Sequence, residues 1–205
     1  MPLRELFFNA PLSTIILIVT IALSYYTLSK NPVLLNELLL HPYRVIHERK
    51  YYMLLTHGFV HVNFLHLGIN MFVFFSFAFR LEIVVGHADF FIIYFGSLII
   101  GALISTIRRR NDPEFRSLGA SGAISGILFS FILFNPNAKL LIFFIIPMRA
   151  WIFAVLFVGV SYYLAKRRYT FIDHEGHLWG ALTGAVLTIL LKPGVVPYFF
   201  RQILG

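Results

Sequence analysis

The chain has 205 residues, of which 59% are hydrophobic and only 13% are charged, and its net charge is +8. A mean hydropathy of +0.80 and apolar stretches near bilayer length exclude an ordinary soluble domain and indicate a polytopic protein of the lipid bilayer. Lysine and arginine cluster between the apolar stretches and form no basic face, so we expect no nucleic-acid partner.

Six segments have the character of membrane-spanning helices: residues 11–28, 62–81, 89–107, 118–134, 148–165 and 173–191. The first lacks a small-residue cleavage site, so we expect a retained helix rather than a signal peptide. The segment VLLNELLL, residues 33–40, is too short to cross and should lie in the interface or re-enter it. Pro147 disfavours helix at Ile146, so the fifth helix should begin near Met148. The chain shows no repeat, which predicts one compact all-α domain over residues 1–205.

Four polar residues recur near one end of the even-numbered helices. Because alternate spans run in the same direction, the second, fourth and sixth begin at the same membrane face. His66 and Asn70 lie early in the second, while Ser121 and His177 lie near the starts of the fourth and sixth. A polar side chain in hydrocarbon is costly and usually faces protein or a water-filled cavity, so we expect these four to converge.

A serine and a histidine at matched depth supply a nucleophile and its general base. Taken singly, Ser121 could bond to a carbonyl of its own helix, and His177 could be a structural hydrogen-bonding residue. As a pair they must approach to about 3 Å. Small residues at intervals of four permit this approach: Gly122 and Gly126 on the fourth helix, and Gly176, Gly180 and Gly184 on the sixth.

His66 and Asn70 are four residues apart and share one face of the second helix. Both side chains can donate hydrogen bonds, as can the backbone N–H of Ser121. Acyl transfer needs such donors around the oxyanion of its tetrahedral intermediate. The alternative is a structural polar pair without a catalytic role.

Five stretches resemble the rhomboid family of intramembrane serine proteases: HVNFLHLGIN at 61–70, RLEIVVGHADFFIIY at 80–94, GASG at 119–122, LFNPNAKLLIFFIIP at 133–147 and GHLWGALTG at 176–184. The resemblance implies a six-helix rhomboid-like bundle that cleaves transmembrane segments of membrane proteins. It makes Ser121 the nucleophile and His177 the base. The oxyanion hole would comprise His66, Asn70 and the Ser121 backbone, with Gly119 shaping the turn before the nucleophile.

The chain departs from the family pattern at two places. The Trp-Arg pair of the first loop is here Tyr52 and Met53. One turn after the nucleophile, where the family often has an aromatic ring that stacks on the catalytic histidine, this chain has Ser125. Neither change removes a catalytic group.

Other histidines raise the possibility of a metal site. His57 and His61 are four apart, and HEGH at 174–177 resembles part of a zinc motif. The zincin motif is HExxH with both histidines one turn apart, and HEGH is one residue short. We therefore expect no metal and no cofactor, and assign His57 and His61 to loop or interface contacts.

Two further alternatives remain. A non-catalytic rhomboid-like binder of membrane clients would have lost the serine or histidine, and this chain keeps both. A proton-coupled transporter often shows internal repeats, and this chain shows none.

The resemblance places the active site on the outer face of a plasma or inner membrane. The loops on that face carry eleven of the 17 Lys and Arg residues against six on the other, contrary to the positive-inside rule. For the orientation in the membrane we follow the resemblance.

Overall fold

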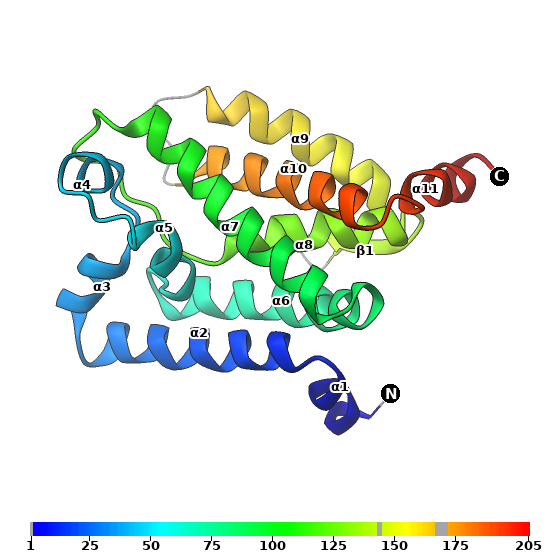
Figure 1. Cartoon of the computed structure of the whole chain (residues 1–205), viewed down its shortest axis with the longest axis horizontal. Coiled ribbons are helices and arrows are strands. Elements are labelled where there is room, and N and C mark those ends of the chain that lie inside the picture. The colour runs from blue at the N-terminus through cyan, green and yellow to red at the C-terminus, as the bar shows by residue number, and fades with distance from the viewer. Residues whose placement is uncertain (1, 143–144, 167–171) are drawn as a thin grey trace.

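The computed structural model describes residues 2–142, 145–166 and 172–205, and its main feature is a bundle of helices (Figure 1). Each of the six apolar segments forms one of them: α2 Pro11–Ser29, α6 Phe64–Val85, α7 His87–Arg109, α8 Ser121–Phe134, α9 Ala150–Ala165 and α10 His174–Leu191. The prediction of an all-α membrane bundle is confirmed.

The six helices differ in length. Among the described residues, α2, α6 and α7 are each long and apolar enough to cross a membrane alone. Helix α10 passes this test together with α11, Val195–Leu204, from which it is bent by 109°. Helix α8 has 14 residues, hence a length of about 21 Å, and the hydrocarbon layer is about 30 Å thick. A helix of this length that starts at one membrane face ends inside the hydrocarbon layer, short of the opposite face.

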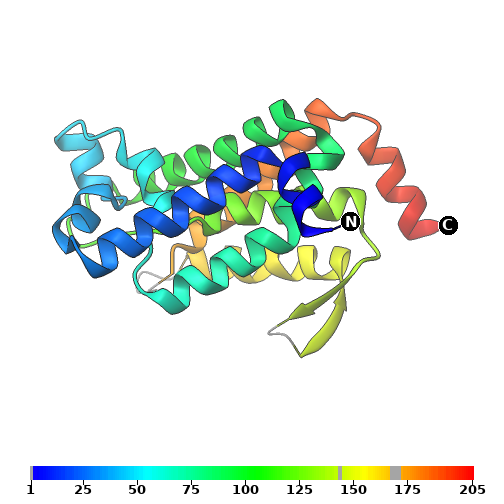
Figure 2. The same ribbon diagram turned by 90° about the horizontal axis from the view of Figure 1, so that it is seen from below.

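Helix α8 lies at the centre of the bundle, in contact with α6, α7 and α10 (Figures 1 and 2). Nine consecutive or nearly consecutive residues are buried in it: Ala123, Ile124, Ser125, Gly126, Ile127, Leu128, Phe129, Ser130 and Ile132. A helix that is apolar on all sides is expected to be surrounded by protein or lipid, and this one is surrounded by protein.

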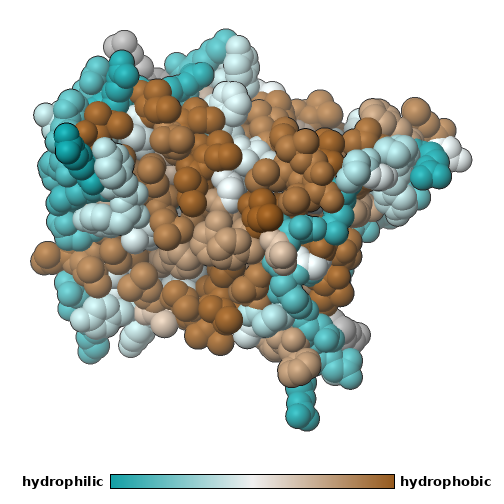
Figure 3. Space-filling view, in the orientation of Figure 1, coloured by the Kyte–Doolittle hydropathy of each residue, from teal (hydrophilic) through white to brown (hydrophobic). Residues whose placement is uncertain are grey.

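The outer helices carry the surface that faces lipid. Figure 3 shows hydrophobic residues across the middle of the bundle and hydrophilic ones gathered at the end near α4. Large apolar side chains are exposed on these helices, including Ile18, Phe72, Phe91, Ile100, Val155 and Leu156. Such an extended apolar surface fits a bilayer and not water.

Shorter elements join the helices. Helix α1, Leu3–Asn9, precedes α2, and the segment between α2 and α6 forms α3 Pro32–Leu38, α4 Pro42–His47, α5 Met53–Thr56 and the 3₁₀ helix η1 His57–Phe59. The apolar segment 33–40 thus forms one short helix and does not cross the bundle. Helices α6, α8 and α10 all begin toward the end of the bundle that carries these elements (Figure 1).

A β-hairpin projects from the bundle at the other end (Figure 2). Strand β1, Lys139–Ile142, pairs antiparallel with β2, Ile146–Arg149, and Leu141 lies opposite Pro147. Sequence reasoning placed the start of the fifth helix at Met148. The helix begins at Ala150 because Met148 and Arg149 pair with β1.

Candidate active site

Ser121 is the first residue of α8 and follows a tight turn. Gly119 has a φ of +115°, a backbone conformation that favours glycine. Its N–H donates to the carbonyl of His57 at 2.9 Å. A Cβ at Gly119 would lie 2.8 Å from Cε1 of His66, so both the backbone angle and the space require glycine.

The strand-like segment before this turn is tied to the loop after α2. Ser117 and Leu40 exchange two backbone hydrogen bonds of 2.8 and 3.0 Å. Together with the bond from Gly119 to His57, they hold the approach to Ser121 at two points. The position of Ser121, the candidate nucleophile, is therefore set by backbone contacts with residues more than 50 positions away along the chain.

His177 lies in the first turn of α10 and reaches Ser121. The distance between Ser121 Oγ and His177 Nε2 is 2.5 Å, a hydrogen bond between side chains 56 residues apart in the sequence. Asp173 caps α10 through a bond from the N–H of Gly176 at 2.8 Å, and the backbone N–H of His177 donates to the Asp173 carbonyl at 3.1 Å. These bonds fix where α10 begins and so where His177 stands.

Close packing of α8 and α10 brings the two side chains together. A Cβ built at Gly180 would collide with the carbonyl oxygen of Gly122, and one at Gly184 would collide with that of Gly126. The predicted glycine contact is thus present in the structure. Sequence reasoning missed Gly101 of α7, where a Cβ would lie 2.7 Å from the carbonyl oxygen of Gly176.

His66 and Asn70 lie on α6 beside the turn before Ser121. Asn63 caps α6 by accepting a bond from the N–H of His66 at 2.8 Å, and the side chain of Asn70 donates to the carbonyl of His66 at 2.9 Å. Within the described residues, neither side chain bonds to Ser121, and the buried Nδ1 of His66 has no partner. The ring of His66 lies against Gly119, two residues before Ser121, and one of its nitrogens has no partner among the described residues.

A cavity of about 20 Å³ adjoins the pair. That is room for one water molecule. Its lining comes from the loop after α2, from α7, from the turn before α8 and from both catalytic candidates: His57, Leu98, Ala102, Ser117, Gly119, Ser121, Gly122, Asp173, Gly176 and His177.

A model of the Rhomboid domain matches residues 48–194, which is more than half of the chain. The chain belongs to the rhomboid family. Among similar proteins, Rhomboid protein 1, mitochondrial, of Saccharomyces cerevisiae is 35% identical over 133 residues, covering 63% of this chain and 38% of the relative. Presenilin-associated rhomboid-like protein, mitochondrial, of Homo sapiens is 28% identical over 137 residues, covering 64% and 35%. The chain spans less than half the length of both relatives.

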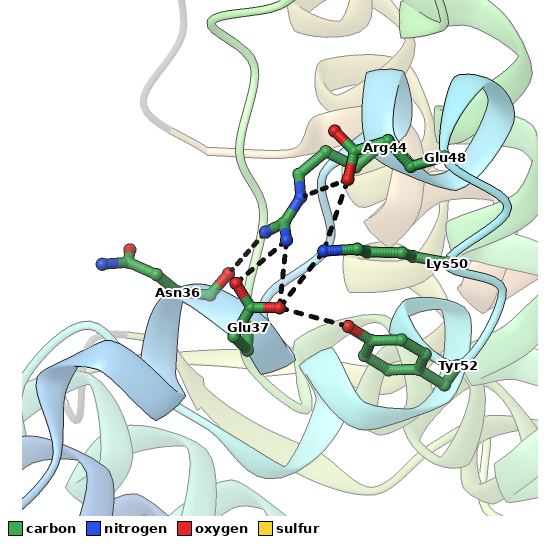
Figure 4. Close-up of polar contacts among 6 residues, drawn as sticks. All are labelled: Asn36, Glu37, Arg44, Glu48, Lys50 and Tyr52. Atoms are coloured by element: carbon green, nitrogen blue, oxygen red, sulfur yellow. Dashed lines mark hydrogen bonds and ion pairs between the residues drawn. The ribbon is translucent and has the colours of Figure 1, made fainter.

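The rhomboid resemblance left open how the loop after α2 is anchored, and the structure gives an answer (Figure 4). Glu37 accepts hydrogen bonds from Arg44 at 2.9 and 3.0 Å, from Lys50 at 3.3 Å and from the Tyr52 hydroxyl at 3.4 Å. The bond from Arg44 lowers the pKa of Glu37. Met53 is fully buried in an apolar cluster with Leu40, Val45 and Ala102. The ion pairs of Glu37 and the burial of Met53 thus anchor this loop, in place of the Trp-Arg pair that the family usually has.

The position one turn after Ser121, the candidate nucleophile, also departs from the family pattern. Ser125 donates to the carbonyl of Ser121 at 2.8 Å, so its side chain is bonded to its own helix. The ring of His174 stands edge-on to that of His177, with centroids 6.4 Å apart. His174 is therefore the ring that neighbours the candidate base in this rhomboid.

His57 and His61, considered above as metal ligands, make protein contacts. Nδ1 of His57 lies 2.9 Å from the carbonyl oxygen of Met53, and Nδ1 of His61 lies 2.9 Å from the hydroxyl of Ser24 on α2. Burial lowers the pKa of His57 to about 4 and that of His61 to about 3. Both rings are consequently neutral at physiological pH, and they join the loop to the bundle.

Proposed function

We propose that this chain is an intramembrane serine endopeptidase that cleaves transmembrane segments of membrane proteins with a Ser121–His177 dyad. The observation that carries the proposal is the 2.5 Å hydrogen bond between Ser121 Oγ and His177 Nε2. Membership of the rhomboid family supports it, because the resemblance of GASG at 119–122 and GHLWGALTG at 176–184 implies that Ser121 is the nucleophile and His177 the base.

The first half of the reaction uses the dyad and the donors around it. His177 Nε2 takes the proton of the Ser121 hydroxyl as Oγ attacks the substrate carbonyl carbon. The developing oxyanion is stabilised by the backbone N–H of Ser121 and by the side chains of His66 and Asn70. His177 then gives its proton to the departing amine, and the peptide bond breaks to leave an acyl ester on Ser121.

The second half requires water at the ester. The cavity beside Ser121 and His177 has room for one water molecule. His177 removes a proton from this water, the resulting hydroxide attacks the ester carbonyl, and the proton returns to Ser121 Oγ as the acid departs. No metal or cofactor takes part in this scheme.

The substrate is expected to be a membrane protein whose helix is weak near one end. A stable helix engages its carbonyl groups in internal hydrogen bonds and hides them from Ser121. Gly, Pro or polar residues near the end of the substrate helix expose a scissile carbonyl. We place the protein in a plasma or inner membrane with the site near the outer face. The names of the relatives cited above are those of mitochondrial proteins.

The test is cleavage of a model single-span substrate by the purified protein in detergent and in proteoliposomes. Wild-type protein should cut it, whereas Ser121→Ala and His177→Ala should each abolish cleavage and remain folded. The double variant should be no worse than either single variant, because the pair acts as a unit. Substrate binding without cleavage by the wild type would favour the non-catalytic binder. Robust cleavage by Ser121→Ala would overturn the mechanism, and strong inhibition by zinc chelators would point to a metalloprotease.

A further inference from the structure

Asp173 immediately precedes α10 and lines the same cavity as Ser121 and His177. It stands four residues before His177, which is the spacing of neighbours on one helix face. Its role as the helix cap accounts for one carboxylate oxygen, which accepts from the N–H of Gly176 at 2.8 Å. The second carboxylate oxygen is not part of this cap.

The second carboxylate oxygen is held by α7. The hydroxyl of Ser105, a fully buried residue, donates to Asp173 Oδ2 at 2.9 Å. The carboxylate is thus fixed by two neutral donors from two helices. No ion pair among the described residues includes it. No described cation therefore lies within ion-pair distance of this carboxylate.

Glu175 provides a contrast on the same turn. Its carboxylate pairs with Arg108 of α7 at 2.8 Å, so its charge is neutralised locally. Both acids join α10 to α7, but only Asp173 lines the cavity with the dyad.

The location of His177 in the first turn of α10 makes a nearby negative charge favourable. The first turn of a helix carries the positive end of the helix dipole, which disfavours the imidazolium that forms when His177 takes a proton. Besides Asp173, the ionisable groups within the described ranges whose charge bears on His177 are His174 of α10 and His66 of α6, and neither can supply a negative charge. A carboxylate at the helix cap opposes the dipole and favours the cation.

We propose that Asp173 is a positioning residue for the Ser121–His177 dyad, whose carboxylate fixes the first turn of α10 and stabilises the His177 imidazolium during acyl transfer. Ser105 holds this carboxylate in place. The inference rests on the function proposed above and assigns a third residue to the same reaction. The Asp173 carboxylate bonds to Gly176 and Ser105 and to neither member of the dyad, so we assign it an effect that passes through His177.

The decisive variant is Asp173→Asn, because asparagine caps a helix as well as aspartate does but carries no charge. We expect kcat to fall by about ten- to a hundredfold as the charge is lost, with KM and the thermal unfolding midpoint nearly unchanged. Glu175→Gln is the matched control, since it removes a carboxylate from the same turn and should leave kcat within about twofold of wild type. Ser105→Ala should reduce kcat by less than Asp173→Asn, because the carboxylate remains.

Asp173→Glu separates charge from capping, since glutamate keeps the charge and is the weaker cap. Rates of labelling by a serine-directed phosphonate, expressed per folded molecule, should order as wild type, Glu and then Asn. The inference is overturned if Asp173→Asn retains wild-type kcat, or if Asn exceeds Glu per folded molecule, which would make capping the whole effect. Failure of the proposed function looks different, because wild-type protein would then show no Ser121-dependent cleavage.

Discussion

The carboxylate of Glu82 on α6 accepts a hydrogen bond of 2.7 Å from the backbone N–H of Ser13 on α2. It also accepts from the N–H of Leu12 at 3.1 Å and lies 2.7 Å from Nδ1 of His87 on α7. The first N–H groups of a helix have no partner within it, and Pro11 has none to offer. Glu82 thus caps α2 from another helix and joins three helices at the end of the bundle opposite Ser121.

We therefore predict that Glu82 contributes to stability and not to chemistry. Glu82→Leu leaves the N–H of the buried Ser13 and that of the half-buried Leu12 without acceptors, which should lower the free energy of unfolding by about 2–4 kcal/mol. Glu82→Gln should cost less, because one oxygen can still accept. Thermal unfolding in detergent measures both effects, and phosphonate labelling of the folded fraction should match wild type. A Glu82→Leu protein as stable as wild type would show that these bonds are dispensable.

The second prediction concerns the donors around the oxyanion. In the proposed mechanism, each of these two side chains donates a hydrogen bond to the oxyanion of the tetrahedral intermediate. His66→Ala or Asn70→Ala would remove that bond, so turnover should fall by about ten- to a thousandfold. Unlike Ser121→Ala, both variants should still react with a serine-directed phosphonate, since the nucleophile and base remain. Initial rates of cleavage with a model substrate measure the effect. Full activity in both variants would show that His66 and Asn70 have a structural role only.

Much of this arrangement could be predicted from the sequence because its signals are local or periodic. Hydropathy located the six helices, and glycines at intervals of four located the contact between α8 and α10, where a Cβ at Gly180 would collide with Gly122. Alternation of direction placed Ser121 and His177 at one depth. The resemblance to the rhomboid family then named their roles.

The contacts that sequence reasoning missed join residues far apart in the chain. Ser105 and Asp173 are 68 residues apart, and Ser13 and Glu82 are 69 apart, so neither pair leaves a pattern in any short window. The strands β1 and β2 were missed for another reason. The segment KLLIFFIIPMR is apolar enough to resemble part of a span, and only Pro147 signalled that the helix must start later.

The third prediction is a pH dependence of stability. Burial lowers the pKa of His57 from 6.5 to about 4, and its side chain is 6% exposed. Between these values the unfolded chain binds the proton and the folded chain does not, so stability falls as the pH drops from about 6.5 toward 4. Above about pH 6.5 the group has no such effect. The full shift corresponds to about 3 kcal/mol.

His57→Asn tests this assignment, because an asparagine can still donate to the Met53 carbonyl but does not titrate in this range. The variant should lose less stability than wild type between pH 7 and pH 5. Thermal unfolding midpoints at several pH values measure the difference, and His61, which titrates in the same sense, is unchanged in both proteins. Parallel pH profiles would mean that His57 does not contribute to the acid sensitivity.

The last prediction tests the close packing of α8 and α10. Gly180 lies three residues after His177, and any Cβ there would collide with the carbonyl oxygen of Gly122, one residue after Ser121. A valine must push the two backbones apart, and a displacement of about 1 Å costs about a hundredfold in rate through lost alignment. We expect Gly180→Val to abolish cleavage with Ser121 and His177 both intact.

Leu190→Val is the control, because Leu190 is 71% exposed near the far end of α10 and its replacement should change little. Cleavage and thermal unfolding of both variants should be measured in one detergent. Wild-type activity in Gly180→Val would show that the helices do not meet at this point, and the geometry of the dyad would have to be rebuilt.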